Sequence, residues 1–436
     1  MNEKNYRRKP KKEEGLFTMT AIPHSELVSK IKRYDKLILS KPDYAEAYFN
    51  RGVLFIQLGR FEEAIKDYDR AIQIKPDYAD AFNNRGIALQ ELGQLELAIE
   101  SYDRSIQIKP ENFMAYHNQG IVLRELGQLE QAIVCCNNAI KIKPNYAEAY
   151  YNRGVAFQEL GQLENAIESY SKAIQIKPDY AEVYVSCGIA LQELGQLEKA
   201  IVSCNKALQL NPDSNSAQHI LNSLLGNDSK SAPKEYIESL FDKYAQNFEN
   251  SLVNKLGYTA PSLFKKTLSS LNLINNKFNR AIDLGCGTGL VGIEFRNIVD
   301  VLIGIDLSKK MIRKAEEKNV YDELVVNDLI SGLEDLKTNF DLFISADVFV
   351  YLGDLCPLLD SVKKHAHHRS LFIFSTEDIP GDGFYLQKTG RFAHSKNYIV
   401  STASNYGFQT EHFEKHALRK DKGEWIVGGI YILRKI

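Results

Sequence analysis

The stretch AIDLGCGTGLVGIEF, residues 281–295, contains the residues with the clearest potential for chemistry. An apolar run leads into Asp283, and glycines follow at positions 285, 287 and 289. Glycine adopts positive φ angles and leaves room for a ligand to press against the backbone. The spacing therefore predicts a loop that holds a cofactor. Nicotinamide enzymes favour G-x-G-x-x-G, whereas this chain has Leu290 at the third glycine position.

Short apolar stretches alternate with helical patterns around this loop. We expect strands in RAIDL, VLIGID, ELVVND, FDLFISAD and SLFIFST, with helical stretches such as SKKMIRKAEEK between them. The alternation predicts a parallel sheet with helices on both faces. Such sheets bind ligands beyond the carboxyl ends of their strands. Asp306 and Asp328 follow the second and third expected strands, at the edge where the glycine loop lies.

The glycine loop and these two acids together resemble the motifs of class I S-adenosylmethionine-dependent methyltransferases. The resemblance implies an α/β Rossmann-like domain with a mostly parallel seven-stranded sheet, and S-adenosyl-L-methionine as the cofactor. Asp306 would accept the ribose hydroxyls, Asp328 would receive the adenine amino group, and Asp283 would orient the methionine ammonium group. The implied cofactor-binding residues are Asp283, Gly285, Cys286, Gly287, Thr288, Gly289, Asp306, Leu307, Asp328, Leu329 and Tyr244.

Further stretches extend the resemblance to predicted methyltransferases that carry tetratricopeptide repeats. These stretches are FDKYAQNFENSLVNKLGYTAP, DVFVYLGDL and GRFAHSKNY. Methyl transfer depends mainly on alignment, and a base is needed only if the acceptor must lose a proton. Candidates for that role are Asp347 and Tyr351, after the fourth strand; Asp347 has the alternative role of supporting the amino-acid end of the cofactor.

An acceptor site is expected in TGRFAHSKNYIV, where Arg391 and His394 lie beside aromatic residues. Arginine can hold a carboxylate through two parallel hydrogen bonds, which suggests a carboxylate-bearing acceptor. The alternative for this stretch is the start of a helix, with Ser395 as its cap. The histidines of HAHHRS suggest a metal, but no fourth ligand has suitable spacing, so we expect no metal site.

The first half of the chain is one unit of 34 residues repeated in five full copies, at 45–78, 79–112, 113–146, 147–180 and 181–214. Each copy contains two helical patterns and is closed by proline, which cannot continue a helix. The copies resemble tetratricopeptide repeats (TPRs) and predict an α-solenoid, a TPR superhelix.

A solenoid of this kind forms a groove that commonly holds a protein or peptide. Asparagine recurs at the sixth place of the repeat, and a ladder of amides could pair with a peptide backbone. The alternative is that these asparagines are partly structural. The candidate groove residues are Asn50, Asn84, Asn118 and Asn152.

These features predict four segments. Residues 1–24 form a disordered basic leader, and 25–226 form the solenoid, with a partial repeat before the five copies and a capping helix after them. Residues 227–233 form a linker. Residues 234–436 form the methyltransferase domain with N-terminal cap helices.

Composition and charge limit the cellular compartment and the classes of binding partner that we expect. The formal net charge is −2, so no large basic field attracts nucleic acid or an anionic membrane. The sequence lacks a long apolar run and a secretory signal, and none of its six cysteines forms a C-x-x-C pair. We therefore expect a cytoplasmic protein with reduced thiols.

The leading hypothesis is a methyltransferase that acts on a small molecule and uses its TPR domain for protein–protein interaction. One alternative is a protein methyltransferase whose TPR groove recruits the substrate. The other is a non-catalytic scaffold whose second domain binds the cofactor without transferring its methyl group.

Overall fold

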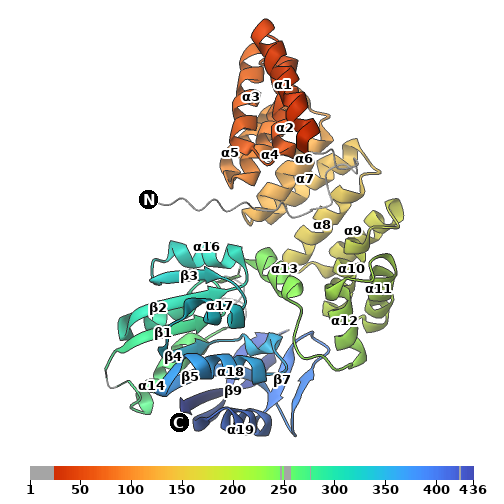
Figure 1. The fold of residues 1–436 in the computed structure, drawn as a ribbon. Helices are drawn as coiled ribbons and strands as arrows, with labels where there is room; N and C mark the ends of the chain where they lie inside the picture. The colour runs from red at the N-terminus through yellow and green to blue at the C-terminus, as the bar shows by residue number, and fades with distance from the viewer. Residues whose placement is uncertain (1–23, 246–247, 250–256, 275, 422–423) are drawn as a thin grey trace. The chain divides into compact units, whose positions relative to one another are not determined.

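The computed structural model describes residues 24–245, 248–249, 257–274, 276–421 and 424–436. The contacts between residues divide the chain into two units, one ending at Leu160 and one beginning at Gly161 (Figure 1). The leader expected over 1–24 lies outside the described residues except for His24, which begins the first helix. The linker expected at 227–233 and the domain boundaries beside it stay predictions.

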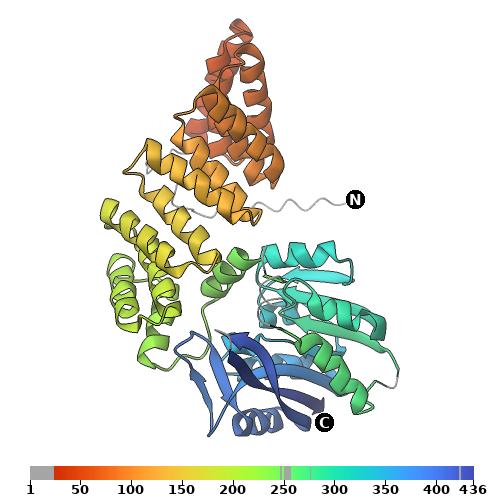
Figure 2. The same cartoon turned by 180° about the vertical axis from the view of Figure 1, so that it is seen from behind.

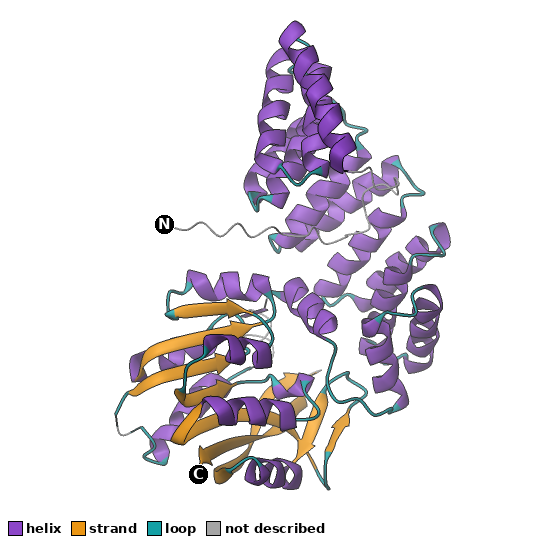
Figure 3. Ribbon diagram, in the orientation of Figure 1, coloured by secondary structure: helices purple, strands orange, loops and turns teal. Residues whose placement is uncertain are grey.

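The first unit consists of consecutive helical hairpins (Figure 3). Each hairpin turns at a glycine with positive φ, as at Gly59 with φ of 69°, and each second helix ends before a proline. The helices are α1 His24–Ser40, α2 Ala45–Gln57, α3 Phe61–Ile74, α4 Ala79–Glu91, α5 Leu95–Ile108, α6 Phe113–Glu125, α7 Leu129–Ile142 and α8 Ala147–Glu159.

Glycine at the eighth place of the repeat allows the two helices of a hairpin to approach closely. A Cβ on Gly86 in α4 would lie 2.5 Å from the ring of Tyr102 in α5. The third copy has a smaller neighbour at this contact, because a Cβ on Gly120 would lie 3.4 Å from the Cys136 sulfur. The repeat therefore keeps its close approach while the side chain that fills it varies.

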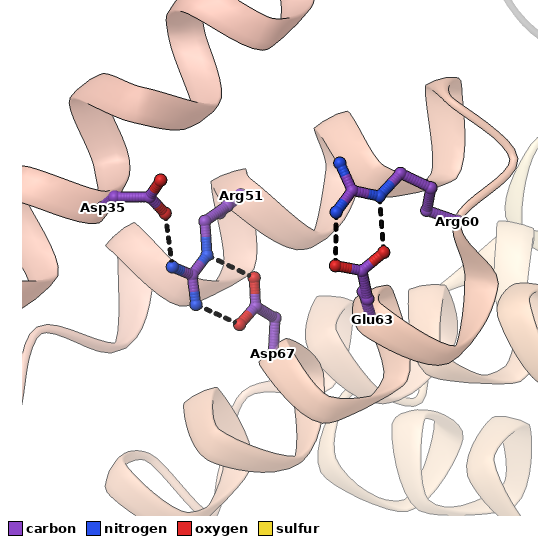
Figure 4. A network of polar contacts seen from close by, with 5 residues as sticks. All are labelled: Asp35, Arg51, Arg60, Glu63 and Asp67. Atoms are coloured by element: carbon purple, nitrogen blue, oxygen red, sulfur yellow. Dashed lines mark hydrogen bonds and ion pairs between the residues drawn. The ribbon is translucent and has the colours of Figure 1, made fainter.

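Polar side chains join consecutive hairpins at a fixed spacing. Arg51 donates two hydrogen bonds to Asp67, at 2.8 and 2.6 Å, and one to Asp35, at 2.7 Å (Figure 4). Both partners lie 16 residues from Arg51. Arg85 makes the corresponding bonds to Asp69 and Ser101. The arginine at the seventh place thus ties its own hairpin to the preceding one.

The second unit continues with the helical hairpin pattern and then changes to alternating helices and strands. Its first helices are α9 Leu163–Ile176, α10 Ala181–Glu193, α11 Leu197–Leu210, α12 Asn215–Leu225, α13 Lys234–Tyr244 and α14 Ala260–Ser270. The later helices are α15 Leu290–Phe295, α16 Lys309–Glu317, α17 Leu329–Leu336, α18 Cys356–His365 and α19 Lys396–Asn405, with short 3₁₀ helices at Arg296–Ile298 and Phe349–Tyr351.

The strands of the second unit form one sheet (Figure 2). The strands are β1 Phe278–Leu284, β2 Val299–Asp306, β3 Glu323–Val326, β4 Phe340–Ser345, β5 Ala366–Ile379, β6 Phe384–Leu386, β7 Phe392–Ser395, β8 Phe408–Asp421 and β9 Glu424–Lys435. The order β3-β2-β1-β4-β5 is parallel throughout, and β9 joins β5 in the antiparallel sense with β8 outside it.

These seven strands confirm the predicted mostly parallel, Rossmann-like sheet. The structure adds a hairpin that the sequence did not predict: β7 pairs with the end of β5 at residues 377–379, and β6 pairs with β7. Alternating residues of each strand point to opposite faces of the sheet and pack into two hydrophobic cores, one on each face. Ile282 and Phe343 pack with α18 and α19, whereas Ala281 and Leu342 pack with α14 and α15.

Candidate active site

The loop after β1 is fastened to the neighbouring strand by its backbone. The N–H groups of Gly285 and Cys286 both donate to the Ile305 carbonyl, at 2.8 and 2.9 Å. Gly285, Gly287 and Gly289 all have positive φ, at 82°, 53° and 93°. Among the described residues, a Cβ on Gly287 would find only the Phe248 ring nearby, at 3.8 Å, and Gly287 lines the cavity.

Asp306 ends β2 and holds the glycine loop from the other side. Its carboxylate accepts from the N–H of Gly287 at 2.9 Å and from the N–H of Ser308 at 2.8 Å. Burial raises the pKa of Asp306 to about 6, although the two backbone donors act against that shift. The acid thus lines the cavity and fixes the shape of the loop at the same time.

Asp328 caps α17 and also binds the first residue of α13. One oxygen accepts from the Ser331 N–H at 3.1 Å, and the other lies 2.7 Å from the Lys234 ammonium. Burial opposes ionisation, but the ion pair and the cap hold the pKa of Asp328 below its usual value. Leu307 and Leu329, beside the two acids, also line the cavity.

Asp283 is fully buried and is not among the described residues that line the cavity. The Tyr321 hydroxyl donates to its Oδ2 at 2.6 Å and accepts from the Gly292 N–H at 3.1 Å. Its Oδ1 has no hydrogen-bond partner among the described residues. Burial raises the pKa of Asp283 to about 7. Tyr321, which no sequence motif indicated, thus links β1 to the start of α15.

Asp347 lies after β4 with a φ of 62° and belongs to a buried ionic network. Arg419 on β8 forms ion pairs with Asp347 and with Glu377 on β5, and its side chain is 1% exposed. Gln387 donates to the second oxygen of Glu377 at 3.0 Å. Arg419 was missed because its neighbours, in LRKDKGEW, are typical of an exposed hairpin.

The two predicted acceptor residues have different surroundings. Arg391 and Tyr351 both line the cavity. His394 is fully buried, and its Nε2 lies 3.0 Å from the Gly353 carbonyl oxygen. Burial lowers the pKa of His394 to about 4. The alternative of a helix start is confirmed, because the Ser395 hydroxyl accepts from the Tyr398 N–H and caps α19.

The cavity has a volume of about 480 Å³ and lies at the carboxyl ends of β1, β2 and β4. Its opposite wall includes Ile237 and Phe241 of α13 and the segment 230–232. That segment is held by the loop after β4, since the Ala232 N–H donates to the Tyr351 carbonyl at 2.9 Å. The side chain of Tyr244 lies outside the described residues. Within the described ranges, no group of His, Cys, Asp and Glu is arranged to hold a metal ion.

The asparagines proposed for the TPR groove differ in their contacts. Asn50 is exposed, and Asn152 is half-buried. Asn83 donates to Asn84 at 3.1 Å and accepts from Asn118 at 3.1 Å, so two of the four belong to an amide chain across neighbouring hairpins.

Comparison with known families matches both parts of the chain. Profiles described as TPR repeat match residues 52–93, 120–161 and 156–195, and profiles described as tetratricopeptide repeat match 79–112, 181–214 and 101–134. A profile described as methyltransferase domain matches 275–424. The fold and the matches define a TPR-containing protein with a class I methyltransferase domain.

Several solved structures match part of the chain. YrrB, described as a TPR protein with an unusual peptide-binding site, is 23% identical, with 43% of this chain and 97% of that chain covered and a TM-score of 0.38. MamA from Desulfovibrio magneticus is 25% identical, with 39% and 96% covered and a TM-score of 0.37. PilF of Pseudomonas aeruginosa is 19% identical, with 48% and 90% covered and a TM-score of 0.39. A search of curated proteins found no match.

None of the described helices combines the length and the apolar character that crossing a membrane requires.

Proposed function

We propose that this chain is an S-adenosylmethionine-dependent methyltransferase that acts on a small molecule and uses its TPR solenoid to bind a protein or peptide. The observation that carries the proposal is the cavity edge at the ends of β1 and β2. There a bare glycine backbone faces a space that Asp306 and Asp328 also line. A bare loop beside two strand-end acids suits an adenosyl group.

The residues around this edge fit such a cofactor. The Asp306 carboxylate is positioned by two backbone donors and can accept from ribose hydroxyls with its remaining lone pairs. Leu307 and Leu329 supply apolar surface for a flat ring. Asp328 would exchange the Lys234 ammonium for the amino group of the base. The volume of about 480 Å³ falls in the range of small-molecule sites.

Bound S-adenosylmethionine supplies a methyl group on a positively charged sulfur, which is a good leaving group. The chain's contribution is then alignment of the acceptor, which can lower a barrier by roughly 7–11 kcal/mol when the geometry is near ideal. Arg391 would hold a carboxylate of the acceptor. Burial raises the pKa of Tyr351, so its hydroxyl keeps its proton and serves as a donor. Asp347 is held by Arg419, and we assign it a supporting role.

Titration calorimetry with S-adenosylmethionine tests the proposal directly. Wild-type protein should bind the cofactor, and Asp306→Asn should bind it about tenfold to a hundredfold more weakly. Each lost hydrogen bond to a charged acceptor costs about 1.5–3 kcal/mol. Asp300→Asn, at the exposed opposite end of β2, is the matched control and should bind normally. Absence of binding to the wild-type protein would contradict the proposal.

The acceptor class is tested by incubating labelled cofactor with cell extract. We expect the label in the small-molecule fraction. Label in the protein fraction would favour a protein methyltransferase, whose substrate the solenoid recruits. Binding without any transfer would favour a scaffold.

All six cysteines are free thiols. Reduced thiols are typical of the cytosol, so we propose a cytoplasmic location.

A further inference from the structure

The last helices of the solenoid bind a turn of the methyltransferase domain within the second unit. Gln192 of α10 donates from Nε2 to the Lys388 carbonyl at 2.6 Å and to the Ser223 hydroxyl at 3.0 Å. His219 of α12 has its Nε2 3.0 Å from the Gly390 carbonyl oxygen. Both partners on the domain are backbone carbonyls of the turn between β6 and β7.

His219 is suited to hold this turn in one position. It is 2% exposed, and its ring lies 4.8 Å from the Tyr236 ring. Its Nδ1 has no partner among the described residues, whereas Nε2 faces a carbonyl acceptor. The neutral ring must therefore carry its proton on Nε2 and donate it to Gly390. Burial lowers the pKa of His219, which favours this neutral form.

The turn that is held in this way carries a residue of the cavity. The Gln387 N–H donates to the Arg391 carbonyl at 2.8 Å, and the Gly390 N–H donates to the Gln387 carbonyl at 2.9 Å. Arg391 directly follows Gly390 and lines the cavity. The Gln387 side chain also reaches Glu377, the partner of Arg419. A shift of the turn would thus reach two charged groups of the cavity wall.

The end of the solenoid differs from an ordinary cap. Terminal units of repeat proteins usually present a polar outer face to solvent. Here α12 instead buries a polar histidine against the domain, as well as the apolar side chains expected in a solenoid. Buried polar contacts of this kind specify one geometry, because an unmade bond would leave a buried group unsatisfied. The buried residues of α12 are Ala217, His219, Ile220, Leu221, Ser223 and Leu224.

We propose that Gln192 and His219 are positioning residues of the methyltransferase. They hold the turn 387–391 so that Arg391 stands in the cavity, and the last repeat and its cap thereby set the affinity for the acceptor. This inference rests on the proposed function for its consequence in catalysis. The bracing itself can be measured without any substrate.

Hydrogen exchange tests the bracing. His219→Phe keeps a ring against Tyr236 and removes the donor, and Gln192→Met removes the amide at similar length. In both variants the amides of residues 387–391 should exchange about two- to tenfold faster, the effect of losing one hydrogen bond. His219→Gln, which keeps a donor, should exchange more slowly than His219→Phe. Gln218→Met on the same helix is the control, because this exposed amide bonds only Asn222 among the interactions described.

The same samples separate this inference from the proposed function. Exchange of the β2 residues 303–306 and the affinity for S-adenosylmethionine should match the wild type in every variant. If His219→Phe does not fold, Gln192→Met alone decides the question. Unchanged exchange over 387–391 in the folded variants overturns the inference. If wild-type protein does not bind the cofactor, the proposed function fails, and the exchange result still reports on the bracing.

Transfer assays test the consequence. With saturating labelled cofactor and increasing amounts of the small-molecule fraction of cell extract, Gln192→Met should need several-fold more extract for half-maximal transfer at an unchanged maximal rate. The control Gln218→Met should follow the wild type. A lower maximal rate with unchanged half-saturation would contradict a role in positioning Arg391.

Discussion

Two glycines in different halves of the chain have different surroundings, and we expect one to affect stability and the other binding. Gly86 lies in a solenoid helix, where a Cβ would meet the ring of Tyr102 at 2.5 Å. Gly287 lies in the loop after β1, where a Cβ would meet, among the described residues, only Phe248, at 3.8 Å. A side chain of the protein fills the space beside Gly86, whereas no described side chain fills the space beside Gly287.

Buried polar groups differ between the two regions in where they lie. In the solenoid, the guanidinium of Arg51 binds Asp67 and Asp35, which join consecutive hairpins. In the second unit, Arg419 lines the cavity and binds Asp347 and Glu377. Both regions also contain buried polar atoms without a hydrogen-bond partner among the described residues, such as the Tyr68 hydroxyl and Oδ1 of Asp283. We expect substitutions in the solenoid to change stability and substitutions around the cavity to change affinity.

The largest effect is expected for Gly287→Ala. The added methyl group would occupy space that the proposed cofactor needs, and crowding by one extra methyl group costs about 1–3 kcal/mol. The positive φ adds roughly 1–2 kcal/mol of strain. Calorimetry should show cofactor affinity lowered by about tenfold to a hundredfold, with the protein still folded by circular dichroism. Unaltered affinity would remove the contrast between the two glycines.

The second effect concerns Gly86→Ala compared with Gly120→Ala. Alanine favours a helix over glycine by about 0.8–1.0 kcal/mol in both places. At Gly86 the buried Tyr102 ring must move, which costs about 1–3 kcal/mol. At Gly120 the nearest atoms are farther away, namely the Ala132 carbonyl oxygen at 3.2 Å and the Cys136 sulfur at 3.4 Å. Urea unfolding followed by circular dichroism should rank Gly120→Ala as the more stable variant. The reverse order would show that the ring adapts freely. Cofactor affinity should be the same in both.

The third prediction uses pH to compare stability and binding at one residue. The pKa of Asp283 is raised to about 7 in the fold by burial, whereas an unfolded aspartate has a pKa near 3.9. Folded protein therefore keeps the proton longer, so this group lowers stability progressively as pH rises from about 4 to 7. Asp283→Asn removes that loss.

Thermal unfolding at pH 5 and pH 8 checks this sign. The increase in Tm of Asp283→Asn over wild type should be larger at pH 8 than at pH 5. The difference between the two increases should be at least about 2–4 °C, which corresponds to 1 kcal/mol. Under the proposed function, cofactor binding by wild type should tighten as pH rises through 7, because the ionised carboxylate would attract the ammonium group of S-adenosylmethionine. An equal gain at both pH values would show that Asp283 is already ionised at pH 5.

The smallest effect is expected at the polar ladder of the solenoid. The Asp35 side chain is 44% exposed, so Asp35→Asn should cost less than about 1 kcal/mol. The Asp67 side chain is 6% exposed and binds Arg51 through both oxygens, so Asp67→Asn should cost more. Urea midpoints of the two variants measure the difference. Equal costs would mean that burial does not strengthen this ladder.

The parts of the molecule that local sequence determines were predictable. The repeat period fixes the helical hairpins, because each hairpin packs mainly through residues at constant places such as Gly52 and Tyr68. The glycine loop and Asp306 were also predictable, since both lie at the ends of strands with a clear apolar pattern. These elements need only neighbours that are close along the chain or close in the parallel sheet.

Contacts between distant segments were not predictable. Arg419 meets Asp347 across 72 residues, and His219 meets the Gly390 carbonyl across 171 residues. Neither pairing leaves a periodic signal in the sequence. Arg419 is a single charge in a polar stretch, and the partner of His219 is a backbone atom. The β6–β7 hairpin was missed for a related reason: its strands of three and four residues are too short to show an alternating pattern.

The ladder of 16-residue bridges has a consequence for how such a chain changes length. Each bridge uses only residues of its own hairpin and the one before it, so a whole hairpin can be gained or lost among the first copies while every remaining junction stays complete. The last copy and the helix after it have no such freedom, since Gln192 and His219 bind the turn between β6 and β7. Sequence variation in the solenoid can therefore accumulate at its amino-terminal end without disturbing that turn.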